Sequence, residues 1–170
     1  MLRTFFAALT PWLLISTFAL GQQQPAADKP AKPAPSREEL EKQFAESLSG
    51  ATLVGNFTIT GLKSDQPLKE ERYTLGKVSK LKNGDFWSFQ ARIQYGDHDV
   101  NVPLALEVKW AGDTPMITLT DVGIPGLGTY TARVLFYRDQ YAGTWSGSTH
   151  GGHLFGKVVK ENAEAKPAEK

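Results

Sequence analysis

The sequence predicts an all-β domain, a single antiparallel up-and-down eight-stranded barrel or a highly curved meander, with one short N-terminal α-helix. Apolar and polar residues alternate along several runs, as they do in a strand that buries one face. Turn-forming residues separate these runs, and every connection is short enough to join antiparallel neighbours. We expect strands at residues 51–60, 70–81, 85–95, 99–110, 115–121, 129–138, 141–147 and 153–160.

The first 21 residues have the three-part organisation of a secretory signal peptide. Arg3 precedes an apolar run over residues 5–20, and small residues stand at the minus-three and minus-one positions of a cleavage after Gly21. Pro11 interrupts this run, which is shorter than the roughly 20 apolar residues of a membrane span. The absence of cysteine excludes a lipid-modified N-terminus. We therefore expect a secreted, periplasmic or cell-envelope protein with no integral membrane anchor after cleavage.

Composition divides the remaining chain into four parts. Residues 22–35 are rich in Pro, Ala, Lys and Gln, which predicts a disordered linker, and residues 161–170 predict a disordered tail. A short helix is expected at 36–49 and one β-barrel-like domain at 50–160. The chain has 19 basic and 18 acidic residues, so loss of Arg3 with the signal leaves a formally neutral protein. This balance predicts no nucleic-acid partner, because such partners select a basic excess.

The helix prediction depends on signals at both of its ends. Ser36 and Glu39 form a capping-box pattern, in which each side chain satisfies a free backbone N–H. Gly50 follows the expected end, where a permissive residue is common. Between these signals, one apolar stripe that packs on the domain is formed by residues four apart, Leu40, Phe44 and Leu48.

Eight strands can close into a barrel that side chains fill completely or that holds one small ligand. Gly76 interrupts the second strand, where a bulge would supply curvature. An open, curved sheet around the helix is the alternative. Large inward-facing side chains are the candidates for lining a ligand pocket or for filling the core, namely Trp87, Phe89, Tyr95, Trp110, Tyr130, Phe136 and Trp145.

The connections differ in length between the two ends of such a meander. The even-numbered connections are tight, at 83–84, 112–113 and 139–140. Three of the four odd-numbered connections are longer, at 61–69, 122–128 and 148–152. The domain is therefore expected to resemble a cup whose mouth carries the odd-numbered connections.

Motifs for metal binding or catalysis are weak. His98, His150 and His153 lie at or beside the odd-numbered end, but their spacing is not that of a metal site, so we predict no metal and no cofactor. The glycine-rich 123–128 segment joins two strands and is not followed by a helix that could bind phosphate. Glu70 and Glu71 are adjacent in a strand and must face opposite sides, which argues against a catalytic carboxylate pair.

Gly143-Thr144-Trp145, in a strand near the end of the domain, resembles the Gly-x-Trp element of lipocalin- and avidin-type barrels. In those barrels the tryptophan packs across the closed end, and the element lies on the first strand. The resemblance covers three residues and the eight-strand meander, a calycin-like architecture. It implies a barrel-packing role for Trp145.

Two functions remain for the domain. The first is an exported, non-enzymatic barrel that binds a small apolar or amphipathic ligand. The alternative is a structural or protein-interaction module of the cell envelope with a filled barrel core. An envelope protein would be the partner in the second case.

Overall fold

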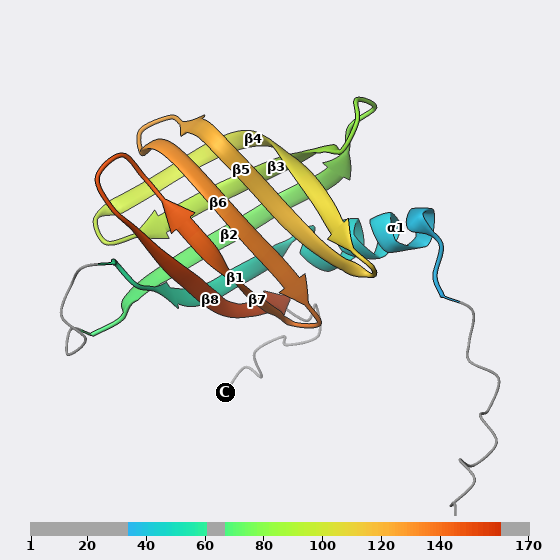
Figure 1. Cartoon of the computed structure of the whole chain (residues 1–170), viewed down its shortest axis with the longest axis horizontal. Helices are drawn as coiled ribbons and strands as arrows, with labels where there is room; N and C mark the ends of the chain where they lie inside the picture. The colour runs from blue at the N-terminus through green and yellow to red at the C-terminus, as the bar shows by residue number, and fades with distance from the viewer. Residues whose placement is uncertain (1–33, 61–66, 161–170) are drawn as a thin grey trace, which may run out of the picture. The chain divides into compact units, whose positions relative to one another are not determined.

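The computed structural model describes residues 34–60 and 67–160. The expected signal peptide, residues 22–33 of the linker, and the tail lie outside the described residues. The elements are α1 (Arg37–Leu48), β1 (Ala51–Phe57), β2 (Lys69–Lys80), β3 (Phe86–Tyr95), β4 (His98–Ala111), β5 (Thr114–Ile124), β6 (Gly128–Tyr137), β7 (Gln140–Ser146) and β8 (Gly151–Lys160) (Figure 1).

The eight strands form a closed barrel in which each strand pairs antiparallel with its neighbours in sequence. Closure is made by β8, which pairs antiparallel with β1 along the whole of β1, from Ala51 opposite Lys160 to Phe57 opposite Leu154. The predicted up-and-down barrel is confirmed, and the open curved sheet is excluded. Closure gives every strand two neighbours, although β4 pairs with β5 only from Glu107 opposite Thr118 to Ala111 opposite Thr114.

Helix α1 begins with the predicted capping box. The Ser36 hydroxyl accepts a hydrogen bond from the Glu39 backbone N–H at 3.2 Å, and Glu39 Oε2 accepts one from the Ser36 N–H at 2.7 Å. Phe44 and Leu48 are buried, whereas Leu40, the third residue of the expected stripe, stays partly exposed. Among the described residues, no helix is long and apolar enough to span a bilayer.

The end of α1 is fastened to a bulge in β2. The β2–β3 register shifts between Leu75 and Val78, which confirms the irregularity predicted at Gly76. The Ser49 hydroxyl accepts a hydrogen bond from the Val78 N–H at 3.0 Å, and the Gly50 N–H donates to the Gly76 carbonyl at 3.0 Å. The bulge thus frees backbone groups that hold the helix against the barrel.

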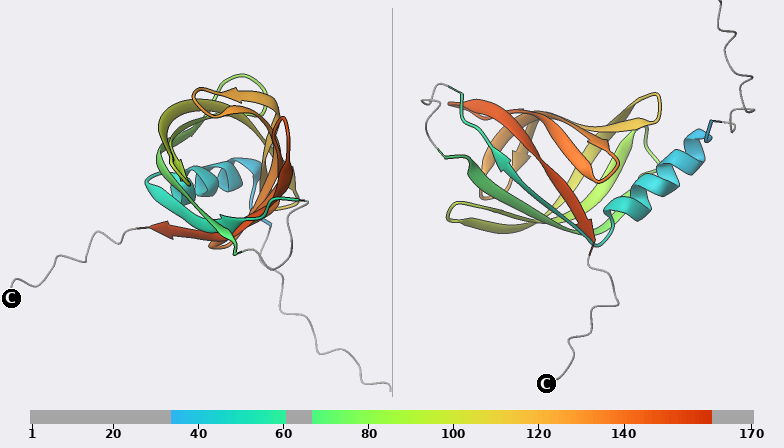
Figure 2. Two further views of the ribbon diagram at one scale, coloured as in Figure 1. Left: turned by 90° about the vertical axis from the view of Figure 1, so that its left-hand side faces the viewer. Right: turned by 90° about the horizontal axis from the view of Figure 1, so that it is seen from below.

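Helix α1 lies across one end of the ring of strands (Figure 2). Its Phe44 ring is 3% exposed and packs edge-on against four aromatic rings. The centroid distances are 5.1 Å to Trp87, 6.5 Å to Phe89, 5.9 Å to Trp110 and 6.1 Å to Phe136. Helix α1 lies at the end of the barrel where the even-numbered connections lie (Figure 1), so the Phe44 cluster is at that end.

The odd-numbered connections lie at the other end, but two of them are shorter than predicted. Strand β5 continues to Ile124, which pairs with Gly128, so only 125–127 separate β5 from β6. Strand β8 begins at Gly151, which pairs with Ser146. Both differences have one cause: glycine lowers strand propensity but keeps the N–H and C=O groups that pair strands. The 61–66 part of the first connection lies outside the described residues.

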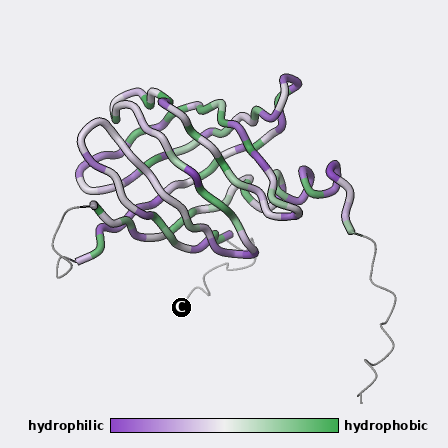
Figure 3. Tube along the Cα trace, viewed as in Figure 1, coloured by the Kyte–Doolittle hydropathy of each residue, from purple (hydrophilic) through white to green (hydrophobic). Residues whose placement is uncertain are grey.

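Hydrophilic and hydrophobic stretches are interleaved along the strands (Figure 3). In β3 the pattern is regular, because Trp87, Phe89, Ala91 and Ile93 are buried and the residues between them are not. This is the period of two expected for a strand with one face in a core. The inward face of the barrel therefore follows from the alternation in the sequence.

Candidate functional site

A cavity of about 530 Å³ occupies the part of the barrel that α1 does not fill. It extends to the end with the odd-numbered connections, because Gly96, Asp97 and His150 are among the residues that line it. Most of its wall is aliphatic or aromatic, with side chains from all eight strands. Ligand sites in proteins typically have volumes of about 300 to 1,000 Å³ and apolar walls with a few polar groups.

The structure divides the seven candidate lining residues between the two ends of the barrel. Five line the cavity: Phe89, Tyr95, Tyr130, Phe136 and Trp145.

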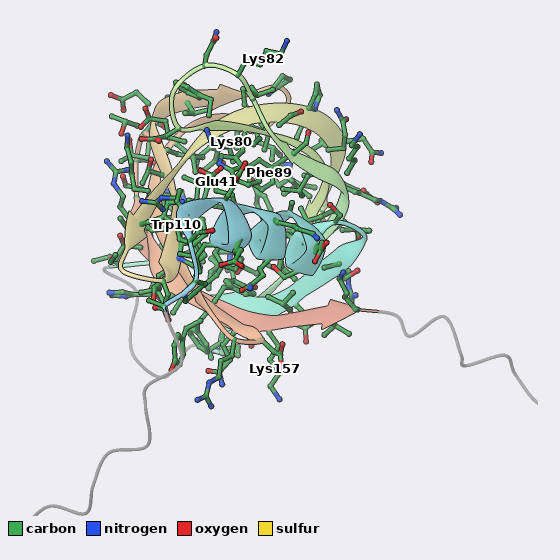
Figure 4. The ribbon with its side chains drawn as sticks, turned by 90° about the vertical axis from the view of Figure 1, so that its right-hand side faces the viewer. Glu41, Lys80, Lys82, Phe89, Trp110 and Lys157 are labelled. Atoms are coloured by element: carbon green, nitrogen blue, oxygen red, sulfur yellow. The ribbon has the colours of Figure 1, made fainter. Side chains whose placement is uncertain are left out.

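The other two candidates, Trp87 and Trp110, do not line the cavity. Trp87 is 1% exposed and lies beneath Phe44. Trp110 borders a groove between α1 and the strands and lies beside α1 in the view from that end (Figure 4), with the Arg37 guanidinium 4.9 Å from its ring centre. Both rings pack against Phe44 of α1, which occupies this end of the barrel.

Aromatic side chains surround the cavity near the odd-numbered connections. The Tyr95 and Tyr130 hydroxyls lie 3.2 Å apart, and the Tyr130 hydroxyl donates to the Leu127 carbonyl at 3.0 Å. Trp145 packs edge-on against Phe57, with their ring centroids 5.7 Å apart. Trp145 therefore packs on Phe57 in the cavity wall near the odd-numbered connections, not across the end that α1 fills.

The three histidines do not converge. His98 packs on Tyr95, His150 packs on Trp145, and both line the cavity. His153 is exposed on the outer face, where its backbone N–H donates to the Thr58 hydroxyl at 3.0 Å. Within the described ranges no group of three or more His, Cys, Asp or Glu side chains could hold a metal ion.

One carboxylate is buried in the wall of this cavity. Glu71 is 5% exposed, whereas its neighbour Glu70 is on the outside, so the two face opposite sides as predicted. The Tyr73 hydroxyl donates to Glu71 Oε2 at 2.8 Å, and the Tyr141 hydroxyl donates to Oε1 at 3.0 Å. Each carboxylate oxygen thus accepts one hydrogen bond from a tyrosine.

A row of two glycines brings Tyr141 to Glu71. Strand pairing sets Glu71 opposite Gly55, Gly55 opposite Gly156, and Gly156 opposite Tyr141. A Cβ on Gly156 would lie 2.7 Å from Tyr141 Cε1, and a Cβ on Gly55 would collide with the Tyr141 hydroxyl. The Tyr141 side chain therefore crosses β8 and β1 over the backbone of Gly156 and Gly55, where no side chain blocks it.

Burial raises the pKa of Glu71 to about 6, although both tyrosine hydrogen bonds act to lower it. Burial also raises the pKa of Tyr73 and of Tyr141, and the negative charge of Glu71 raises both further. The two phenols therefore remain protonated donors around a carboxylate that is mostly ionised at neutral pH.

The sequence prediction missed Glu71, Tyr73 and Tyr141. Two signals could have found them. The alternation that places Tyr73 and Leu75 inward places Glu71 inward too, and glycines in the middle of strands mark close approaches of other groups. What the sequence did not indicate is that Tyr141 would cross two strands to meet this carboxylate.

The fold and the cavity define the class of this protein: a closed eight-stranded antiparallel barrel, filled at one end by a helix and hollow at the other. Comparisons with models of protein families, with curated proteins and with solved structures found no significant match.

Proposed function

We propose that this protein is an exported, non-enzymatic barrel that binds a small apolar or amphipathic molecule in its cavity. The observation that carries the proposal is the apolar cavity of about 530 Å³, with a single buried carboxylate among the wall residues described above. Its volume suits one small molecule. A mainly apolar wall favours an apolar ligand body, because each Å² of apolar surface removed from water contributes about 25 cal/mol.

The alternative function, an envelope module with a filled core, fits only the α1 end. There Phe44 packs edge-on against Trp87 and Trp110 inside the barrel, and a groove remains between α1 and the strands. At the other end, side chains from eight strands surround the cavity instead of filling it. Ligand binding is therefore the better supported of the two functions.

A cavity-filling substitution tests the proposal. Ala132 is buried and lines the cavity, whereas Ala142 is exposed on the outer face of the neighbouring strand. We expect N-phenyl-1-naphthylamine, a neutral apolar fluorescent probe, to bind the wild type. Ala132→Phe should weaken this binding at least tenfold, and Ala142→Phe should leave it unchanged.

Two outcomes would contradict ligand binding in the cavity. One is a wild-type protein that neither binds the probe nor retains a small molecule through purification. The other is an Ala132→Phe variant that folds and binds the probe as the wild type does. A ligand recovered chemically unchanged after incubation with the protein supports a non-enzymatic role.

Export is supported by residues 1–21 of the sequence. Expression of the full chain in a bacterium should give a protein outside the cytoplasmic membrane whose N-terminus is Gln22, as measured by intact mass. Leu13→Arg, which places a charge in the apolar run, should retain the uncleaved chain in the cytoplasm. An uncleaved wild-type chain in the cytoplasm would argue against export.

A further inference from the structure

We propose that the ligand of this barrel is an amphipathic amine, whose protonated amino group is held by the Glu71 carboxylate while its apolar body fills the cavity. This inference rests on the proposed function, because it requires a ligand in the cavity. Three observations carry it: the hydrogen bonding of Glu71, the lack of an ion-pair partner for it among residues 34–60 and 67–160, and the aromatic wall.

Glu71 retains acceptor capacity in the cavity wall. A carboxylate has about four lone-pair sites, and the hydroxyls of Tyr73 and Tyr141 occupy two of them. The tyrosines present donors to the carboxylate and leave its remaining sites without a described partner. A ligand that meets this group must therefore bring hydrogen-bond donors.

The negative charge of Glu71 is not balanced within the described part of the chain. No Lys, Arg or His of residues 34–60 and 67–160 forms an ion pair with it. Lys69, two residues away on the same face, lines the cavity but is itself exposed. A buried charge without a partner is unfavourable, and a ligand ammonium would supply the missing counter-charge together with up to three N–H donors.

The aromatic wall favours the same ligand charge. Phe57, Tyr73, Tyr95, Tyr130, Tyr141 and Trp145 all line the cavity. Aromatic ring faces attract cations, most strongly where water is excluded. An anionic ligand head placed beside Glu71 would instead be repelled by its carboxylate.

Three probes of equal chain length test the inference by displacement of N-phenyl-1-naphthylamine at pH 8: n-octylamine, n-octanol and sodium octanoate. We expect octylamine to displace the probe from the wild type at a concentration at least tenfold lower than either other compound. Glu71→Gln keeps the side-chain shape and removes the charge. In this variant the preference for the amine over the alcohol should fall to less than threefold.

Glu70→Gln is the matched control, because it removes the adjacent carboxylate from the outer face. It should keep the full preference for octylamine. Circular dichroism and binding of the neutral probe show whether each variant is folded with its cavity intact.

The possible outcomes separate the two proposals. If the probe binds but octanol or octanoate competes as well as octylamine, the amine inference is wrong and the binding barrel stands. If Glu71→Gln keeps the tenfold preference, Glu71 is not the recognising group and the inference is also overturned. If no compound and no probe binds the wild type, both proposals fail together.

Discussion

The Tyr141 hydroxyl donates a hydrogen bond to Glu71 Oε1 at 3.0 Å, although 70 residues separate the two in sequence. The bond joins β7 to β2 across the inside of the barrel, over the bare backbone of Gly55 and Gly156. It makes a buried carboxylate, two phenols and two glycines into one structural unit. This unit has consequences for stability as well as for binding.

The charge of Glu71 should make stability depend on pH. Its pKa rises from 4.5 to about 6 on folding, so the folded state holds the proton more tightly than the unfolded chain does. Stability must then fall as the pH rises through this interval, and the cost of about 2 kcal/mol is complete above about pH 7. It is absent below about pH 4.

Urea unfolding of the wild type and Glu71→Gln at pH 4 and pH 7.5 measures this effect. The free energy of unfolding of the variant, relative to the wild type, should increase by about 2 kcal/mol between the two pH values. Lys69, His98 and His150 also line the cavity, but they are present in both proteins. Glu70→Gln should show no such change, and a pH-independent difference for Glu71→Gln would refute the assignment.

Gly156→Ala should destabilise the barrel by roughly 1 to 3 kcal/mol, the usual cost of overpacking. The new Cβ would collide with the Val54 carbonyl oxygen and would lie 2.7 Å from both Gly55 Cα and Tyr141 Cε1, so the backbone of β1 or β8 must shift. The midpoint of urea unfolding measures the loss. Gly123→Ala, in another strand, meets open space and should change stability far less. Equal losses of stability for the two substitutions would show that the barrel does not require glycine at position 156.

Phe44→Ala should cost about 3 to 5 kcal/mol, the range for removing a large buried aromatic side chain. The reason is that Phe44 contacts the rings of Trp87, Trp110 and Phe136 and fills one end of the barrel. Gln43→Ala, at an exposed neighbouring position of α1, should stay within about 0.5 kcal/mol of the wild type. A small loss for Phe44→Ala would mean that α1 is only loosely attached.

Zinc should not stabilise the protein. His153 is on the outer face, while His98 and His150 line the cavity on separate aromatic rings. The melting temperature in a tenfold excess of zinc should therefore equal that in a chelator. An increase in the presence of zinc that His98→Ala abolishes would contradict this prediction.

The sequence predicted the architecture well, because the signals are local. The capping box at Ser36, the alternation in the 85–95 strand and the bend at Gly76 each depend on residues close together in the chain. The two connections predicted too long, at 122–128 and 148–152, also reflect a local signal. Glycines there were read as turn residues, whereas their backbones pair in the barrel.

The sequence by itself determined eight strands, their inward faces and the helix that precedes them. The reason is that the alternation of apolar and polar residues and the turn residues are local patterns, visible in short stretches of the chain. Only the tertiary structure decided that the barrel closes, that Phe44 fills one end, and that Trp87 and Trp110 face the helix instead of the cavity. It also decided that Tyr141 reaches Glu71. These contacts depend on which strands become neighbours when the sheet closes, and on the shape left between them, and neither is encoded in any short stretch of the chain.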